Sequence, residues 1–304
     1  MNDTIRLYAI DWGTSSARAY ALDAAGNVVD ERSAPLGIQR IADGNFAAAL
    51  ATLCQGAAPG VPMLASGMIG SRQGWVEAPY RECPAGFDAI ASGLTPVPQT
   101  RLAIVPGLVC RDAQGVPDVM RGEETQLFGA LADDAVGRQV VVLPGTHSKW
   151  AVVEGRTIEA FTTFMTGELF AVLREHSILG RMIGDGSDAA AFERGVATSL
   201  CEDAALTHDL FSARTLPLTG ALASAGVADY LSGLLLGAEI AAARRWMARR
   251  SLGDAGVTLI GDAALCGRYR TALSIAAVGA ELGPGAAAAR GLWRIAQHAG
   301  LLQV

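Results

Sequence analysis

Short apolar runs separated by polar turns dominate the first thirty positions, and the same pattern returns near the middle of the chain. In both places the pattern predicts three strands that form an antiparallel meander, with a polar corner after the first strand and a glycine-containing turn after the second. The expected strands are residues 6–10, 18–22 and 28–32, and residues 139–143, 150–153 and 157–163.

The two polar corners resemble each other. When Gly13-Thr14 is laid on Gly145-Thr146, Ser16 falls on Ser148, and a basic residue opens each departing strand. Self-similarity at half the chain length predicts a duplicated domain with a cleft between the halves. We therefore expect an N-terminal domain over residues 1–135 and a C-terminal domain over residues 136–304.

Strand-like and helical patterns alternate over the rest of the chain, which predicts an α/β fold with mixed sheets flanked by helices. Further strands are expected at residues 61–65, 102–105 and 257–260. Helices are expected at residues 46–54, 123–132, 167–176, 230–248, 265–272 and 285–299.

Composition excludes several classes of protein. The 304 residues are 51% hydrophobic and carry a net charge of −6, and no basic block is present, which argues against binding to nucleic acid or to an anionic membrane. The first residues lead into a strand without a signal peptide, and the five cysteines lack metal-site spacing, so a cytoplasmic protein is expected. The apolar helix at residues 230–248 is expected to be core, with a homodimer contact as the alternative.

Two Gly-Thr-x-Ser corners have a physical use, because a tight glycine turn lets backbone N–H groups approach an anion and nearby hydroxyls add donors. Facing each other, the corners would hold a polyphosphate from both sides. The alternative is two ordinary hairpin turns. The candidate phosphate ligands are Gly13, Thr14, Ser15 and Ser16 in one corner, and Gly145, Thr146, His147 and Ser148 in the other.

Charged residues beside the corners add candidate chemistry. Asp11 is suited to hold Mg²⁺, and Lys149 to neutralise charge during phosphoryl transfer. Glu123 and Glu124 open a helix, where they either complement the helix dipole or supply a base for a substrate hydroxyl. The sequence does not choose between the two glutamates.

The segment after the strand at residues 61–65 mixes glycine, hydroxyl, amide, charged and aromatic residues. This composition is typical of a loop that binds a small polar ligand, although a glycine-rich surface connection would look the same. Arg72 or Arg121 would pair with a carboxylate of the ligand. The other candidate ligand contacts are Ser66, Gly67, Met68, Ile69, Gly70, Gln73 and Trp75.

These segments, in this order and over nearly the whole chain, resemble the 2-dehydro-3-deoxygalactonokinase family, which belongs to the superfamily of actin, hexokinase and the heat-shock chaperone ATPases. The resemblance implies two ribonuclease-H-like domains with ATP between them, and transfer of phosphate to the 6-hydroxyl of 2-dehydro-3-deoxy-galactonate. It also places an adenosine motif at Gly261 and Asp262. Pro144 stands where many superfamily members have Asp, so that position carries no metal or base role here.

Two other functions remain open at this point. One is a kinase for a related sugar acid, such as 2-dehydro-3-deoxygluconate. The other is a non-catalytic sensor that binds ATP with the same fold. The presence of Asp11, Lys149 and the Glu123-Glu124 pair favours the kinase.

Overall fold

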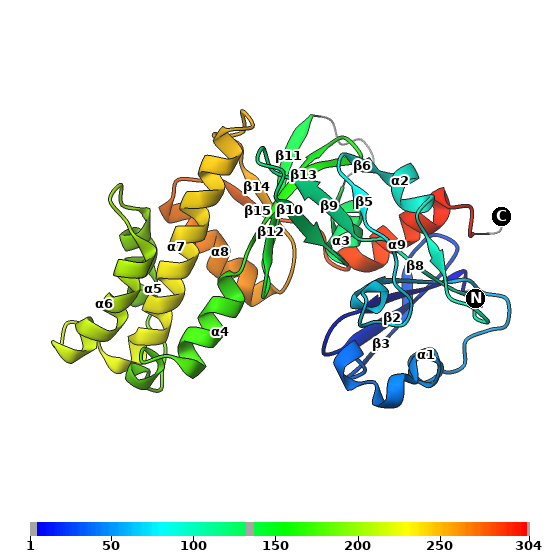
Figure 1. Cartoon of the computed structure of the whole chain (residues 1–304), viewed down its shortest axis with the longest axis horizontal. Coiled ribbons are helices and arrows are strands. Elements are labelled where there is room, and N and C mark those ends of the chain that lie inside the picture. Colours follow the sequence, from blue (N-terminus) through cyan, green and yellow to red (C-terminus); the bar gives the residue numbers. More distant parts are fainter. Residues whose placement is uncertain (1–4, 132–136, 303–304) are drawn as a thin grey trace. The chain divides into compact units, whose positions relative to one another are not determined.

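A computed structural model describes residues 5–131 and 137–302 (Figure 1). It divides into two compact units. Unit 1 consists of Met1–Arg138, Ala151–Phe161 and Pro284–Val304, and unit 2 consists of Gln139–Trp150 and Thr162–Gly283. The boundary expected between residues 135 and 136 lies outside the described residues and stays a prediction.

The main sheet of unit 1 begins with the expected meander, in which β1 pairs antiparallel with β2 and β2 pairs antiparallel with β3. On its other side β1 pairs in parallel with β4, which pairs in parallel with β8. The sheet has the order β3-β2-β1-β4-β8-β7. Its strands are β1 (Leu7–Trp12), β2 (Ala17–Leu22), β3 (Val28–Ala34), β4 (Met63–Gly67), β7 (Thr95–Pro96) and β8 (Leu102–Ile104).

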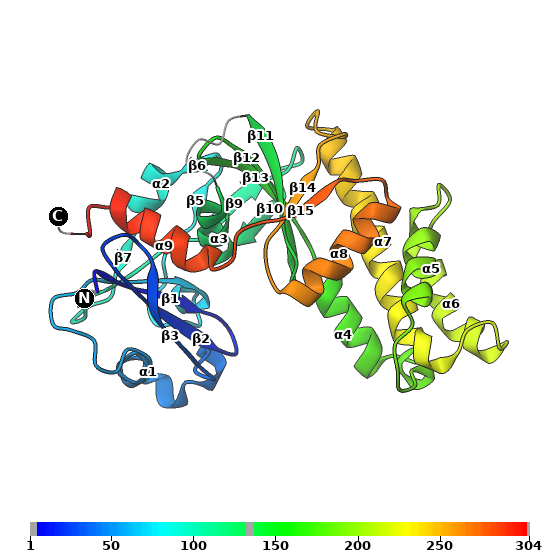
Figure 2. The same cartoon turned by 180° about the vertical axis from the view of Figure 1, so that it is seen from behind.

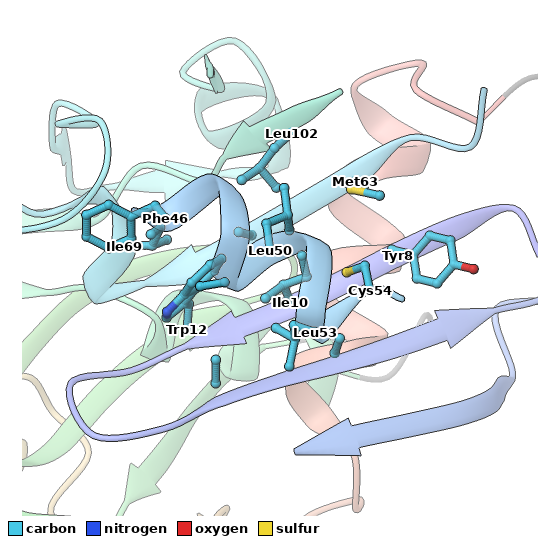
Figure 3. Close-up of a cluster of buried hydrophobic side chains, with 14 of the residues drawn as sticks. Tyr8, Ile10, Trp12, Phe46, Leu50, Leu53, Cys54, Met63, Ile69 and Leu102 are labelled. Atoms are coloured by element: carbon cyan, nitrogen blue, oxygen red, sulfur yellow. The ribbon is translucent and has the colours of Figure 1, made fainter. Parts of the chain in front are cut away.

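One face of this sheet is covered by α1 (Phe46–Leu53), which begins where the Asn45 side chain accepts a hydrogen bond from Ala48 N. Figure 3 shows Leu50 and Leu53 of α1 directed toward Ile10 of the sheet. The buried apolar area of this cluster stabilises unit 1 and fixes the carboxyl ends of β1 and β4.

Unit 1 also contains a small sheet of order β10-β9-β5. Helices α3 and α9 of the same unit pack side by side (Figure 2). Their backbones approach closely at glycines, because a Cβ on Gly129 would lie 1.8 Å from Ala287 O and one on Gly291 would lie 1.8 Å from Thr125 O. The elements are β5 (Arg81–Glu82), β6 (Ala85–Gly86), α2 (Phe87–Ala91), β9 (Leu108–Arg111), β10 (Pro117–Met120), α3 (Glu123–Ala130) and α9 (Ala287–His298).

The third sheet has the order β15-β14-β11-β12-β13-β6, and the division between units falls within β12 and β13. In unit 2, β11, β14 and β15 run parallel. The strands are β11 (Arg138–Leu143), β12 (Ser148–Glu154), β13 (Thr157–Phe164), β14 (Val257–Leu259) and β15 (Ala280–Leu282). The helices are α4 (Thr166–His176), α5 (Ala189–Leu200), α6 (Leu206–Leu218), α7 (Val227–Ala248) and α8 (Ala263–Ile275).

Helix α7 is the central helix of unit 2 and packs against α4, α5, α6 and α8 (Figure 1). Among the described residues, the stretch Ser224–Ala248 is long and apolar enough to cross a membrane by length and composition, but most of it is buried inside the fold. Packing against the neighbouring helices therefore accounts for its apolar character, as expected of a core helix.

The predicted elements are found, with shifts at their ends: β4 starts two residues later than expected and runs through Gly67. Helices α5 and α6 were not predicted. Gly195 lies inside α5 and Pro217 inside α6, and both residue types disfavour a helix. At Gly195 the backbone of α7 packs so closely against α5 that only glycine fits, because a Cβ there would lie 2.3 Å from Tyr230 O.

Candidate active site

In unit 1, the carboxyl ends of two parallel strands bring sequence-predicted residues together. Asp11 on β1 pairs in register with Ser66 on β4, and Trp12 pairs with Gly67. Gly67 has φ +94, and a Cβ there would lie 2.7 Å from Trp12 O, so this position requires glycine. In open α/β sheets, ligands bind at such strand ends.

Asp11 is a partly buried carboxylate opposite Arg18 on β2. Burial raises the pKa of Asp11 above its usual value, and the charge of Arg18 opposes that rise. A carboxylate in this position gains from a bound cation, because the cation restores the stabilisation that burial removes.

The first corner, residues 11–16, turns tightly because Gly13 N donates to Ser16 O at 2.9 Å. Its outer backbone is held by the following loop, where Ile38 N donates to Gly13 O at 3.1 Å. Thr14 is half-buried, whereas Ser15 and Ser16 are exposed. Both serine hydroxyls are therefore accessible to a ligand.

The end of β4 and the loop that follows it contain both buried and exposed positions. Ser66 is fully buried, with its hydroxyl 3.4 Å from that of Thr125, and Ile69 belongs to the hydrophobic core. Trp75 stacks on Phe46 of α1. The backbone at Gly67 and Gly70 is also enclosed, Met68 is half-buried and Gln73 is exposed. Only part of this loop, beginning with its exposed side chains, is accessible to a ligand.

The two arginines proposed for a carboxylate differ in access. The Arg72 side chain is 87% exposed and pairs with Glu77 at 3.2 Å. Arg121 donates to Ala78 O at 2.8 Å and lies over the Tyr80 ring at 4.3 Å. Two of its nitrogens, Nε and Nη1, are buried and have no hydrogen-bond partner among the described residues. Arg121 thus stabilises the loop after β4 through its contacts with Ala78 and Tyr80.

Helix α3 begins beside β4, with Gly122 close to Gly67. The side chain of Glu123 accepts a hydrogen bond from Arg121 N at 2.9 Å, and both carboxyl oxygens of Glu124 accept from Gly122 N at 2.9 and 2.7 Å. Glu124 is fully buried, and burial together with the negative charge of Glu123 raises its pKa to about 8. Glu123 is partly exposed.

In unit 2, the second corner, residues 144–149, joins β11 to β12 and is covered by the first turn of α4. Glu168 N donates to Thr146 O at 3.0 Å, and the Glu168 and His147 side chains hydrogen-bond to each other. A Cβ on Gly167 would lie 2.6 Å from Gly145 O. The corner therefore has a fixed backbone, while Thr146 and His147 remain exposed.

Ser148 and Lys149 point to opposite faces of β12, as consecutive strand residues do. Both side chains are buried. Lys149 Nζ donates to Thr163 Oγ1 at 2.8 Å. The Ser148 hydroxyl lies 3.4 Å from Phe164 O and also interacts with the carboxylate of Glu239. Ser148 has no exposed surface, so its hydroxyl is not available to a phosphate.

Gly261 and Asp262 lie next to the second corner. Gly261 has φ +150 and lies beside Pro144, and Asp262 caps α8 by accepting from Leu265 N at 3.0 Å. A neighbouring cavity of about 340 Å³ is predominantly apolar, which suits a nucleoside. Its lining includes Gly145, Thr166, Phe170, Leu236, Leu265 and Tyr269, together with the charged residues Arg174, Asp229 and Arg268.

Sequence reasoning missed Glu239, a buried acid on α7 that accepts hydrogen bonds from Trp150 Nε1 at 2.8 Å and from Tyr269 OH at 3.0 Å. The available signal was a single carboxylate in the middle of an apolar helix, because such a charge is rarely buried unless it is paired.

Comparison with known proteins agrees with these features. Residues 11–295 match the family described as 2-keto-3-deoxy-galactonokinase. A Rhizobium meliloti (strain 1021) protein named "Probable 2-dehydro-3-deoxygalactonokinase DgoK1" is 40% identical over 307 residues, covering 94% of this chain and 97% of its own length. The chain belongs to the 2-keto-3-deoxy-galactonokinase family.

Other relatives agree with this assignment. The Escherichia coli (strain K12) 2-dehydro-3-deoxygalactonokinase is 37% identical over 271 residues, which cover 88% of this chain and 89% of the relative. A crystal structure described as a putative 2-dehydro-3-deoxygalactonokinase from Sinorhizobium meliloti has a TM-score of 0.86 and 38% identity, over 96% of this chain and 98% of that one.

The wider fold extends beyond the kinase family. The activator of the 2-hydroxyisocaproyl-CoA dehydratase from Clostridium difficile, solved with bound ADPNP, has a TM-score of 0.50 at 8% identity, over 97% of this chain and 96% of that one. Together these findings confirm the expected family, the two-domain α/β fold and an enzyme that is an ATP-using sugar-acid kinase.

Proposed function

We propose that this kinase transfers the γ-phosphoryl group of ATP to the 6-hydroxyl of 2-dehydro-3-deoxy-galactonate. Family membership supports the reaction class and the sugar acid. The structural observation that carries the proposal is the second corner, whose backbone is held by α4 beside a cavity of nucleoside size.

The nucleotide is assigned to unit 2 in this scheme. The adenosine occupies the apolar cavity, and the phosphates meet the backbone N–H groups of the second corner together with the exposed Thr146 and His147 side chains. In unit 1, the first corner is a second proposed phosphate-binding segment, with Ser15 and Ser16 as its exposed hydroxyls.

Mg²⁺ fits the donor set around Asp11. Magnesium in kinases is held by one or two carboxylates together with phosphate oxygens, and Asp11 is a partly buried carboxylate at a strand end. Asp11 would hold the ion, which supplies charge neutralisation on the phosphates.

Glu123 is the proposed base for the 6-hydroxyl. A base must first come within hydrogen-bond reach of the proton that it accepts, and Glu123 is partly exposed whereas Glu124 is fully buried. The 6-hydroxyl oxygen attacks the γ-phosphorus, the bond to the β-phosphate oxygen breaks, ADP leaves and Glu123 receives the proton. Glu124 holds the start of α3 through Gly122 N.

The substrate carboxylate is assigned to Arg72, because its guanidinium is exposed and paired only at the surface with Glu77, whereas Nε and Nη1 of Arg121 are buried. Lys149 is retained as a candidate for phosphate charge neutralisation. That role requires its ammonium to turn from Thr163 toward the phosphates.

The decisive experiment is a coupled ADP-release assay with ATP and Mg²⁺ that compares 2-dehydro-3-deoxy-galactonate, its gluconate epimer and simple hexoses. Turnover selective for the galactonate compound supports the proposal. Selectivity for the epimer keeps the chemistry and replaces the substrate, whereas ATP binding without turnover on any of them supports an ATP sensor. A cytoplasmic location, the absence of nucleic-acid and membrane partners, and a homodimer stay predictions.

The residue assignments are tested in the same assay. Glu123→Gln should lower kcat by about 10²–10⁴-fold, which is the usual contribution of a general base. Glu124→Gln should retain measurable turnover. The reverse ranking of the two variants would give the role of base to Glu124.

A further inference from the structure

We propose that Glu239 is a positioning residue for ATP: its carboxylate ties Ser148 of the second corner to Thr166 of α4 and so fixes the backbone that receives the phosphates. The inference rests on the proposed function, since it assumes that this corner binds ATP. Glu239 itself is not placed in contact with the nucleotide.

Hydrogen-bond donors surround the buried carboxylate of Glu239. It lies in the middle of α7 and is 3% exposed. A buried carboxylate is costly unless several donors satisfy it. Four are present: the Trp150 indole at 2.8 Å, the Tyr269 hydroxyl at 3.0 Å from both oxygens, and the hydroxyls of Thr166 and Ser148. The Ser148 hydroxyl also lies 3.4 Å from Phe164 O, so it is shared between two acceptors.

Two of these donors belong to the phosphate-binding region. Ser148 is the corner residue at which β12 starts, and Thr166 is the first residue of α4. The residues that follow Thr166 touch the corner, because Gly167 packs against Gly145 O and Glu168 N donates to Thr146 O. A displacement of Thr166 would therefore move the backbone that covers the corner.

The other two donors connect the same carboxylate to the rest of unit 2. Trp150 is fully buried on β12, and Tyr269 on α8 lines the cavity proposed for the nucleoside. One buried group thus joins the corner, the start of α4 and a wall of the cavity. Adenosine binding and phosphate binding should both depend on it.

The chemistry requires a carboxylate rather than any polar side chain. The indole N–H of Trp150 can only donate, and a carboxylate accepts from all four donors together. A glutamine in this position would accept with one oxygen and present two N–H groups to the remaining partners. At least one of the hydroxyl contacts must then reverse or break. Burial raises the pKa of Glu239, and its hydrogen bonds oppose that rise.

The test uses Glu239→Gln with Tyr230→Phe as a matched control. Tyr230 is also buried on α7 and its hydroxyl lies 2.8 Å from that of Ser212, so the control removes a buried hydrogen bond of the same helix away from the corner. The measurements are the calorimetric Kd for ATP, the KM for ATP and for the sugar acid, and hydrogen exchange. Glu239→Gln should weaken ATP binding at least tenfold and leave the KM for the sugar acid unchanged. Faster exchange should be confined to peptides spanning residues 144–150 and 165–170.

A second pair of variants isolates the link to α4 with less risk to folding. Thr166→Val keeps the side-chain shape and removes the hydroxyl, whereas Thr166→Ser keeps the hydroxyl. The valine variant should weaken ATP binding several-fold and the serine variant should restore it.

The outcomes separate this inference from the proposed function. Wild-type protein that fails to bind ATP contradicts the proposed function, and the inference with it. Wild-type protein that binds ATP, with a Kd within twofold in Glu239→Gln, or with equal Kd values in Thr166→Val and Thr166→Ser, overturns the inference alone. A loss of ATP binding in Tyr230→Phe equal to that in Glu239→Gln also overturns it, because the effect would then come from α7 in general.

Discussion

The buried carboxyl of Glu124 should make the stability of this protein depend on pH. Glu124 is fully buried at the start of α3, and its pKa rises to about 8 from the ordinary value of 4.5. Below pH 4.5 both the folded and the unfolded chain hold this proton, so it has no effect on the free energy of unfolding. As the pH rises, the unfolded chain releases the proton first, which favours unfolding until the folded pKa is passed.

The size of the effect follows from the difference between the two pKa values. Each unit corresponds to about 1.4 kcal/mol, so Glu124 should lower the free energy of unfolding by about 3 kcal/mol at pH 7 and by about 5 kcal/mol above pH 8. Glu124→Gln removes this proton and keeps an oxygen that can accept from Gly122 N. Its Tm relative to the wild type should therefore increase with pH, by about 5 °C between pH 5 and pH 8.

Differential scanning calorimetry of both proteins at pH 5, 6, 7 and 8 measures this difference directly, and other titrating groups cancel because both proteins share them. Glu193→Gln provides the control, since it removes a glutamate from an exposed position of α5. A Tm difference for Glu124→Gln that stays constant from pH 5 to pH 8 would refute the reasoning. So would a difference that decreases with pH.

Four further predictions concern single positions. Asp11→Asn should lower kcat at least 100-fold without lowering the Tm, measured by ADP release and calorimetry, whereas unchanged kcat would remove Asp11 from the mechanism. Gly167→Ala should raise the KM for ATP at least tenfold, because the new Cβ would lie 2.6 Å from Gly145 O. Gly129→Ala should give a strongly lowered Tm or insoluble protein, since a carbonyl oxygen of α9 would be 1.8 Å from the new Cβ. Gly267→Ala, at an open position inside α8, should instead stabilise by about 0.5–1 kcal/mol and raise the Tm.

The local chemistry of this protein was predictable from short stretches of sequence. Alternating apolar positions located both meanders, because the period of a strand is set by its own backbone. The motifs around Asp11 and Thr146 were also found, since the residues of a corner are adjacent in the chain. The same holds for the start of α3, where Glu123 and Glu124 follow a glycine.

Elements that depend on distant partners were less predictable. Helix α5 contains Gly195, a residue type with low helix propensity. In the folded chain, its missing side chain allows the backbone of α7 to pack closely against α5. Helix α6 contains Pro217 near its end. Both are held in place by their neighbours in unit 2, and helical stability in proteins comes mainly from such packing.

Which candidate residues are accessible was decided only by the tertiary structure. The sequence treats Glu123 and Glu124 alike, whereas the fold buries Glu124 fully and leaves Glu123 partly exposed. It likewise turns the hydroxyl of Ser148 inward to Glu239, which lies 91 positions further along the chain. The sequence by itself determined the family, the corners and the chemistry of their residues, because these are carried by residues next to one another. Burial, pKa and hydrogen-bond partners depend on segments far apart in the chain, and only the folded packing brings those segments together.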